Sequence, residues 1–283
     1  MLKAILNLSI IDAAIQRMAT KAFPFSSLYS DAEKVNRYWN RLELPSKSTA
    51  PEAENWQQLI PLLEQLSFVN CVQILVSDRK TMRFLCAIDK RNVTGYDQRF
   101  YLAEDGLDFS ISNIHPEHLH GILTIQQKAF DFFLPNQKDQ NKIVVNFDGI
   151  YRKFSGQYIH FLQQSIGIEF DKSGLATVFL SYIHDISHLK KEKTGNLVIS
   201  FANEIRWWNY NYEVQCLEEL HPLSKQERRI LSYLSQGKSS KEIANDLFIS
   251  SHTVDTHRRN LLSKTNCIDT SAMVSYARLV GLM

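Results

Sequence analysis

The chain has 283 residues, 44% of them hydrophobic and 22% charged, which is the composition of a globular protein that buries real cores. This length predicts two domains with a helical extension. Ten glycines and seven prolines exclude a collagen-like chain, and no apolar run reaches the ~18 residues of a membrane span. Asp12 interrupts the N-terminal apolar stretch and no cleavage site follows, so we expect a cytoplasmic protein without a signal peptide and with no membrane partner.

Charge and cysteine usage narrow the class of partner. From His221 to the end, nine Lys/Arg stand against five Asp/Glu, an excess of four positive charges, whereas the rest of the chain has an excess of two negative charges. A basic tail on a mildly acidic body favours a polyanion as partner. The four cysteines form no CxxC pair, which argues against structural zinc and against a disulfide framework.

Residues 1–66 are predicted to be a helical N-terminal extension. Apolar residues recur at helical spacing in 2–22, and the stretch 45–55 is a polar linker with two prolines. One further apolar stripe starts a helix after the linker, at Trp56, Leu59, Ile60, Leu63 and Leu66.

Residues 67–192 have the order of an α+β domain. Two strand-like runs begin at Phe68 and Met82, and a helix opens near Pro116, as a first-turn proline allows. Three β-rich runs follow, and their alternation predicts an antiparallel sheet with one buried face. We interpret 193–220 as a connecting segment.

Residues 221–283 are predicted to form four helices. Ser224-x-x-Glu227 and Ser239-x-x-Glu242 are capping boxes, each of which opens a helix. Further start and stop signals are Gly237, Ser251, Asn266, and Asp269 or Thr270.

A tight turn joins the second and third of these helices, and the third exposes Thr256, Arg258 and Arg259, which fits a helix-turn-helix. The alternative is a helical bundle whose charges only solvate one face.

The residues themselves favour the first interpretation. About 55 residues resemble the LuxR/FixJ-type helix-turn-helix, whose pattern this sequence supplies in register. The matching positions are Leu223, Glu227, Leu231, Gly237, Lys241, Glu242, Ile243, Ala244, Leu247, Ile249, Ser250, Thr253, Val254, His257, Asn260 and Lys264. The sequence departs from the pattern at Gln226, Asp255 and Asn266, where the family usually has Arg, Lys and Gly.

The resemblance implies which residues meet DNA. Asp255, Thr256 and Arg259 take the positions that face the major groove, and they lie on one helix face opposite Val254 and Leu261. The remaining candidates for phosphate contact are Ser251, Thr253, His257, Arg258 and Lys264. For His257, a packed and hydrogen-bonded core histidine is an equal alternative.

Region 67–192 resembles a PAS domain. The resemblance depends on residues 92–96 (NVTGY), Gly106, residues 114–117 (IHPE), and Asp185-Ile186-Ser187 followed by Lys190. It implies an antiparallel sheet with short helices, in a domain that senses a small-molecule ligand or light, or that dimerises.

A cofactor stays an open question. His115, His118 and His120 stand where haem-binding PAS proteins place an axial histidine, but surface histidines at a helix start are the favoured interpretation. A flavin would need a reactive cysteine, and we interpret Cys71 and Cys86 as small core residues. The sequence has no Ser-His-Asp set, phosphate loop or HExxH, so an enzyme is not expected.

The sequence therefore predicts a bacterial-type transcriptional regulator that binds double-stranded DNA as a homodimer, with RNA polymerase as a further candidate partner. Candidate dimer surfaces are the apolar stripes of 1–66 and the final helix, 270–281. The alternative is a ligand- or redox-sensing protein-interaction module whose DNA-binding domain is weak or vestigial.

Overall fold

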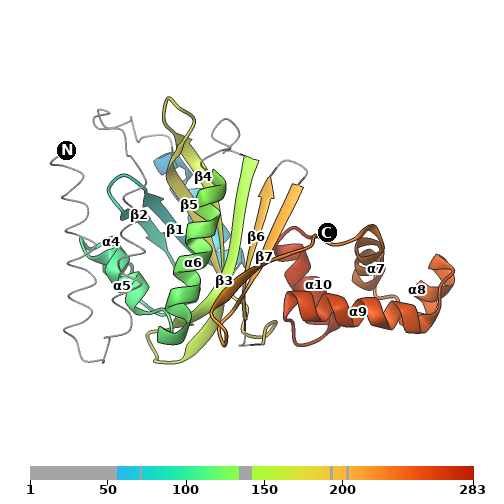
Figure 1. Cartoon of the computed structure of the whole chain (residues 1–283). Coiled ribbons are helices and arrows are strands. Elements are labelled where there is room, and N and C mark those ends of the chain that lie inside the picture. The colour runs from blue at the N-terminus through green and yellow to red at the C-terminus, as the bar shows by residue number, and fades with distance from the viewer. Residues whose placement is uncertain (1–55, 71, 134–141, 192–193, 202–203) are drawn as a thin grey trace.

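The computed structural model describes residues 56–70, 72–133, 142–191, 194–201 and 204–283. Within these ranges, one antiparallel sheet has the strand order β2-β1-β5-β4-β3-β6-β7-β8 and carries helices on both faces (Figure 1). The helices and linker expected in 1–55 lie outside the described residues. No helix in the described ranges is long and apolar enough to cross a membrane.

The first five strands follow the predicted chain order. They are β1 (Gln73–Asp78), β2 (Arg83–Ile88), β3 (Ile143–Arg152), β4 (Tyr158–Phe170) and β5 (Ala176–Asp185). Every pair of neighbours is antiparallel, which confirms the α+β fold class. Helix α3 (Ile60–Asn70) continues past Phe68, so β1 begins later than predicted.

Three helices pack on the face of the sheet that we call the front: α4 (Gln98–Leu102), α5 (Gly106–Ser112) and α6 (Pro116–Phe133). The short 3-10 helix η1 (Trp56–Leu59) and α3 precede them in the chain and pack on the back. Pro116 is the first residue of α6, as predicted. Tyr101, Ile122 and Ile125 from these helices join one buried cluster with Phe147 and Phe161 of the sheet. Figure 1 shows α6 lying across this face.

The interpretation of 193–220 as a connecting segment is wrong. This stretch forms β6 (Thr194–Phe201), β7 (Glu204–Asn211) and β8 (Cys216–Leu220), which extend the sheet beyond β3. Trp207 and Trp208 alternate between the two faces and are 0% and 5% exposed. A strand buried on both faces has continuous apolar character and therefore lacks the alternation that marks a half-exposed strand.

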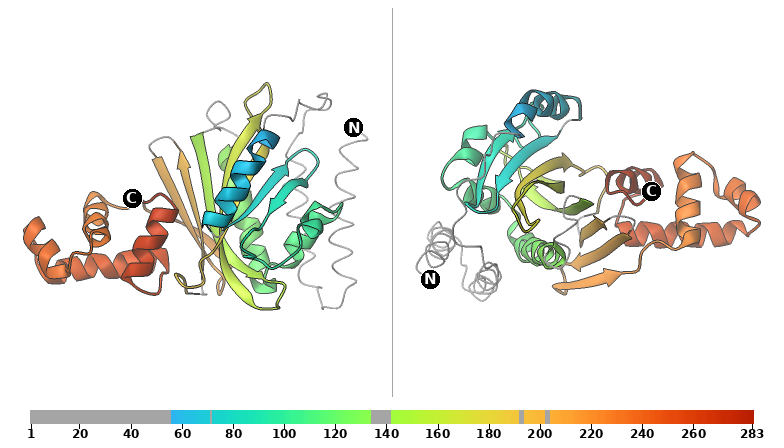
Figure 2. Two further views of the ribbon diagram at one scale, coloured as in Figure 1. Left: turned by 180° about the vertical axis from the view of Figure 1, so that it is seen from behind. Right: turned by 90° about the horizontal axis from the view of Figure 1, so that it is seen from above.

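The expectation of one buried sheet face also needs correction. Ile159 and Phe161 of β4 face the front cluster, while His160 and Leu162 on the back are only 3% and 0% exposed. The back face is covered at one end by α3 and at the other by the C-terminal helices. Seen from above, α6 and α10 lie on opposite sides of the sheet (Figure 2).

The C-terminal region consists of α7 (Lys225–Ser235), α8 (Ser240–Leu247), α9 (Ser251–Thr265) and α10 (Thr270–Leu279). Its apolar residues form a single cluster with Leu162, Val198 and Trp207 of the sheet. Met273, Tyr276 and Ala277 of α10 are fully buried in that cluster. The apolar face of the final helix, one of the two candidate dimer surfaces, is therefore occupied inside the chain.

Candidate nucleic-acid interface

Local caps place the two helices of the helix-turn-helix. In both predicted capping boxes, the serine hydroxyl accepts from the backbone N–H of the glutamate, whose carboxylate accepts from the serine N–H. Ser250 caps α9 by accepting from the N–H of Thr253 at 3.0 Å. Asn266 ends α9 with φ 53°, and Asp269 caps α10. The helix boundaries predicted from these caps are confirmed.

The turn between α8 and α9 contains a residue that the sequence did not single out. Phe248 ends α8 in the left-handed region with φ 54° and is 95% exposed. A bulky side chain in that conformation carries a steric penalty of about 1–2 kcal/mol. The turn therefore holds both backbone strain and an exposed ring at the entry to α9.

The outer face of α9 is a polar stripe, which we call the α9 stripe. Its residues follow helical spacing and are exposed or half-buried: His252, Asp255, Thr256, Arg259, Asn260 and Ser263. Val254 and Leu261 on the opposite face are 0% exposed. The DNA major groove is wide enough to admit an α-helix, and α9 has a polar face with which it could meet the base edges.

All three candidate groove residues belong to this stripe. Asp255 accepts a hydrogen bond from the Ser240 hydroxyl at 2.6 Å. Arg259 donates to the Thr256 hydroxyl at 3.2 Å, a weak bond, and its side chain is exposed. His252, Asn260 and Ser263 share the stripe but were missed as candidates, although their i, i+4 spacing to Thr256 and Arg259 could have revealed them.

Two of the candidate phosphate contacts have partners inside the domain. Arg258 donates to the hydroxyls of Ser240 at 2.6 Å and Thr270 at 3.0 Å, and so links α9 to α8 and α10. Lys264 donates to both carboxylate oxygens of Glu227, at 2.9 and 3.1 Å. Burial alone would raise the pKa of Glu227, but the hydrogen bonds from Lys264 and Ser224 lower it below its ordinary value.

The other candidates lie near the start of α9. Ser251 is its exposed first residue, and Thr253 is half-buried with its hydroxyl 2.8 Å from that of Ser250. His257 is half-buried on the flank between the stripe and the core. The positive end of the helix dipole at this first turn favours an anion such as phosphate.

The three candidate histidines at the start of α6 are His115, which directly precedes the helix, and His118 and His120 within it. His118 is 7% exposed and its ring lies 3.8 Å from the ring of Tyr212, centroid to centroid. Burial, followed by the nearby His115, lowers the pKa of His118 to about 4. His120 lies 2.6 Å from the Tyr210 hydroxyl. The interpretation of these residues as surface histidines therefore fails for His118, which is buried.

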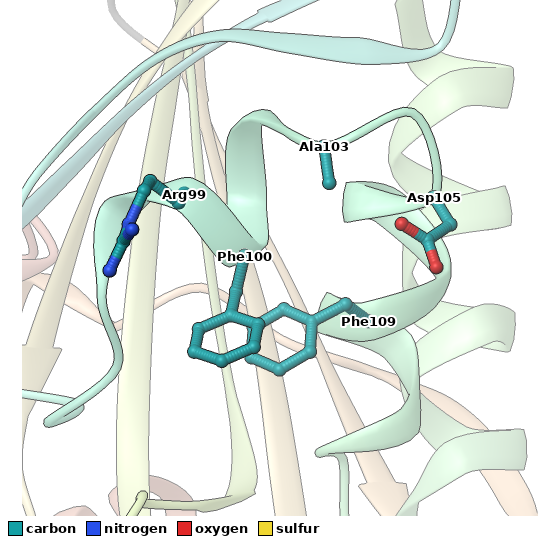
Figure 3. Close-up of a pocket in the computed structure, with 5 residues that line it drawn as sticks. All are labelled: Arg99, Phe100, Ala103, Asp105 and Phe109. Carbon is teal, nitrogen blue, oxygen red and sulfur yellow. The ribbon is translucent and has the colours of Figure 1, made fainter.

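A pocket of about 290 Å³ lies between α4 and α5. Phe100 and Phe109 stack in it with ring centroids 5.1 Å apart, and Arg99 and Asp105 lie on either side of the two rings (Figure 3). Arg99 is already paired with Asp97 at 3.0 Å. The residues that line this pocket belong to the α4–α5 region and not to the α9 stripe.

Comparison with known proteins places the C-terminal region. Residues 221–277 match the model of the bacterial regulatory proteins of the luxR family. Transcriptional regulatory protein MctR of Rhizobium johnstonii is 45% identical over 62 residues, which are 22% of this chain and 29% of that protein. Regulatory protein SdiA of Escherichia coli is 37% identical over 73 residues, 26% of this chain and 30% of that protein. The chain spans under a third of the length of these relatives.

Solved structures resemble the chain at low identity. The Vibrio cholerae VqmA dimer, described as a LuxR-type receptor, is 17% identical with a TM-score of 0.28, covering 80% of this chain and 88% of that one. The N-terminal domain of a diguanylate cyclase with PAS/PAC sensor from Marinobacter aquaeolei is 17% identical with a TM-score of 0.29, covering 41% of this chain and 95% of that one.

Proposed function

We propose that this chain, in which residues 221–277 form a LuxR-type helix-turn-helix domain, is a sequence-specific regulator of transcription that binds double-stranded DNA as a homodimer. Duplex DNA as the partner gives it a cytoplasmic location. Residues 67–192, with their PAS-like element order, sense a signal or carry the dimer contact.

The observation that supports the proposal most strongly is the α9 stripe. Asp255, Thr256 and Arg259 are exposed or half-buried and line one side of a capped helix whose other side is anchored in the core. The guanidinium of Arg259 can fork onto guanine O6 and N7, which is worth about 1–3 kcal/mol of discrimination. Its present bond to a neutral hydroxyl three residues away is far weaker, so the base contact wins on a cognate site.

Binding as a dimer follows from the small footprint of one recognition helix. Two half-sites about one helical turn, or ~34 Å, apart are expected. Light scattering at saturating protein should give two chains per duplex. One chain per duplex at saturation would contradict the homodimer.

The experiment that tests the proposal is a binding-site selection on wild type, Arg259→Ala and Arg258→Ala in the same salt. Arg259→Ala should lower affinity for the selected site roughly tenfold or more and relax the preference at one base pair per half-site. Arg258→Ala should weaken all sequences alike, because that side chain braces α9 against Ser240 and Thr270 and lies on the flank.

The opposite pattern would refute this placement of α9 in the groove. If Arg259→Ala kept the wild-type base preference while Arg258→Ala changed it, the flank and not the α9 stripe would read the bases. If the wild type selected no sequence at all, the alternative of an interaction module without DNA recognition would hold. A visible absorption spectrum of the fresh protein tests the sensor region, because bound haem or flavin would colour it.

A further inference from the structure

A buried polar network joins the DNA-binding helices to the back of the sheet. Asp148 of β3 is 0% exposed and lies at its centre. One of its carboxylate oxygens accepts from the Tyr276 hydroxyl at 2.9 Å and from the Lys190 ammonium at 3.1 Å. The other lies 3.1 Å from His160 Nε2 and 3.2 Å from the backbone nitrogen of Asn196. Residues of β4, β6 and α10, together with Lys190, therefore converge on one carboxylate.

Lys190 completes the network on the helical side. Its ammonium donates to the Thr265 carbonyl at the end of α9, at 2.6 Å, and lies 3.8 Å from the centre of the Tyr276 ring. The side chains of Lys190 and Asp148 are both 0% exposed. Burial alone would raise the pKa of Asp148, but the charge of Lys190 and the hydrogen bond from His160 hold it well below its ordinary value. The carboxylate is therefore charged, and its charge is compensated across the boundary between sheet and helices.

Backbone contacts fix the same boundary beside the network. The N–H of Lys191 donates to the Asn266 carbonyl at 3.0 Å, and the N–H of Ile268 donates to the Leu189 carbonyl at 3.0 Å. Gln164 of β4 also donates to the Leu279 carbonyl at the end of α10, at 2.7 Å. The end of α9 is thus bonded to the segment 189–191 that follows β5, and the end of α10 is bonded to β4 of the sheet.

The chemistry of this boundary suggests a positioning role. Apolar surfaces can slide past one another with little loss, whereas a buried charge is strongly destabilised once its partner moves away. Only one register of α10 on the sheet keeps Tyr276, Lys190 and Asp148 together. Polar groups placed in this way can specify a unique arrangement even where they add little net stability.

We propose that Asp148, Lys190 and Tyr276 are positioning residues for DNA recognition, which hold α9 at a fixed orientation on the sheet. This inference rests on the proposed binding of two half-sites by a dimer. In such a dimer the sheet-bearing parts set the distance between the two recognition helices, because each α9 is rigidly joined to its own sheet. The network therefore sets which half-site spacing the protein accepts.

The test uses duplexes that carry two half-sites with the spacing varied by one to five base pairs, and a duplex with a single half-site. A rigid pair of binding modules gains affinity only where the geometry allows both to bind, and that gain can reach about 10²-fold or more. Wild type should prefer one spacing by at least about tenfold. Tyr276→Phe keeps the ring but loses the hydroxyl, and it should bind all spacings within about threefold while its affinity for a single half-site stays unchanged.

Tyr233→Phe is the matched control, since Tyr233 lies in α7, is only partly buried and does not belong to the network around Asp148. It should keep the wild-type spacing preference. The paired variant Asp148→Asn/Lys190→Met removes both charges together and should behave like Tyr276→Phe, with its fold checked by circular dichroism. If Tyr276→Phe and the paired variant kept the wild-type preference, or if wild type accepted every spacing equally, the positioning role would be wrong.

If wild type bound no DNA, the proposed function would be refuted, but the positioning role would still need its own test. A distance measurement on the free protein provides that test. The distance is measured between two spin labels, each attached to an introduced keto amino acid. One replaces Gln157 in the β3–β4 turn and the other replaces Ser263 on α9, and both positions are exposed. Wild type should give one narrow distance distribution and Tyr276→Phe a clearly broader one. Equal widths would overturn the positioning role independently of any DNA.

Discussion

The ion pair between Asp148 and Lys190 offers a quantitative test of how the chain is held together. The nitrogen–oxygen distance is 3.1 Å and both side chains are 0% exposed. Removing one partner of such a pair leaves an uncompensated buried charge and typically costs about 3–5 kcal/mol. Asp148→Asn and Lys190→Met should each lower the free energy of unfolding by that amount, a large share of the roughly 5–15 kcal/mol of a native protein.

The paired variant should be less destabilised than the sum of the two single variants, because no charge is left unpaired. The matched control is the exposed pair of Lys238 and Asp246, which is closer at 2.6 Å but 34% and 38% exposed. Asp246→Asn should cost at most about 1 kcal/mol.

Urea unfolding followed by circular dichroism measures all of these variants on one scale. The slope of the unfolding free energy against urea must stay constant for the comparison to hold. The reasoning would be refuted if Asp148→Asn cost no more than Asp246→Asn. It would also be refuted if the losses from the two buried single variants were simply additive.

Three further predictions concern other parts of the molecule. The pKa of His118 is lowered from 6.5 to about 4, so as the pH falls the unfolded chain takes up a proton at this residue before the folded chain does. The free energy of unfolding should therefore fall between pH 6.5 and 4, by about 2 kcal/mol at pH 5. Unfolding curves at pH 7 and 5 should show that His118→Phe removes this loss, whereas Tyr212→Phe keeps it. Gly121→Ala should lower the free energy of unfolding in urea by about 1–3 kcal/mol, since the added methyl group would meet the rings of Tyr212 at 2.5 Å and Tyr210 at 2.6 Å. An unchanged urea midpoint would contradict this packing. Phe248→Gly should raise the thermal midpoint of unfolding slightly, because it relieves ~1–2 kcal/mol of left-handed backbone strain and adds only ~0.4–1 kcal/mol of conformational entropy to the unfolded chain. A lowered midpoint would mean that the Phe248 ring makes a stabilising contact.

The sequence was most informative where short-range chemistry decides the structure. Both capping boxes are side chain to backbone contacts three residues apart, and Asn266 ends α9 because its side chain tolerates the left-handed region. The order of the first five strands was equally accessible, since each run is bounded by turns. The exposed side of α9 followed from the spacing of Val254 and Leu261.

Long-range contacts could not be predicted in the same way. The pairing of Lys190 with Asp148, and of Lys264 with Glu227, joins residues 42 and 37 positions apart. The local sequence pattern around Lys264 does not indicate that its ammonium pairs with the carboxylate of Glu227 in the α7 capping box and not with a DNA phosphate. Strand β6 and the Trp207–Trp208 pair of β7 were missed for a related reason, since the docked helices bury their second face and remove the alternation.

In the proposed function, the α9 stripe reads bases in the major groove of two half-sites. Dimethyl sulfate interference on the selected duplex tests it most directly, because methylation of guanine N7 alters the major groove and methylation of adenine N3 the minor groove. We expect binding to be lost on methylation of guanine N7 in two clusters about one helical turn apart, and Arg259→Ala to lose sensitivity at one guanine of each cluster. Interference confined to adenine N3, or at a single cluster, would contradict the claim.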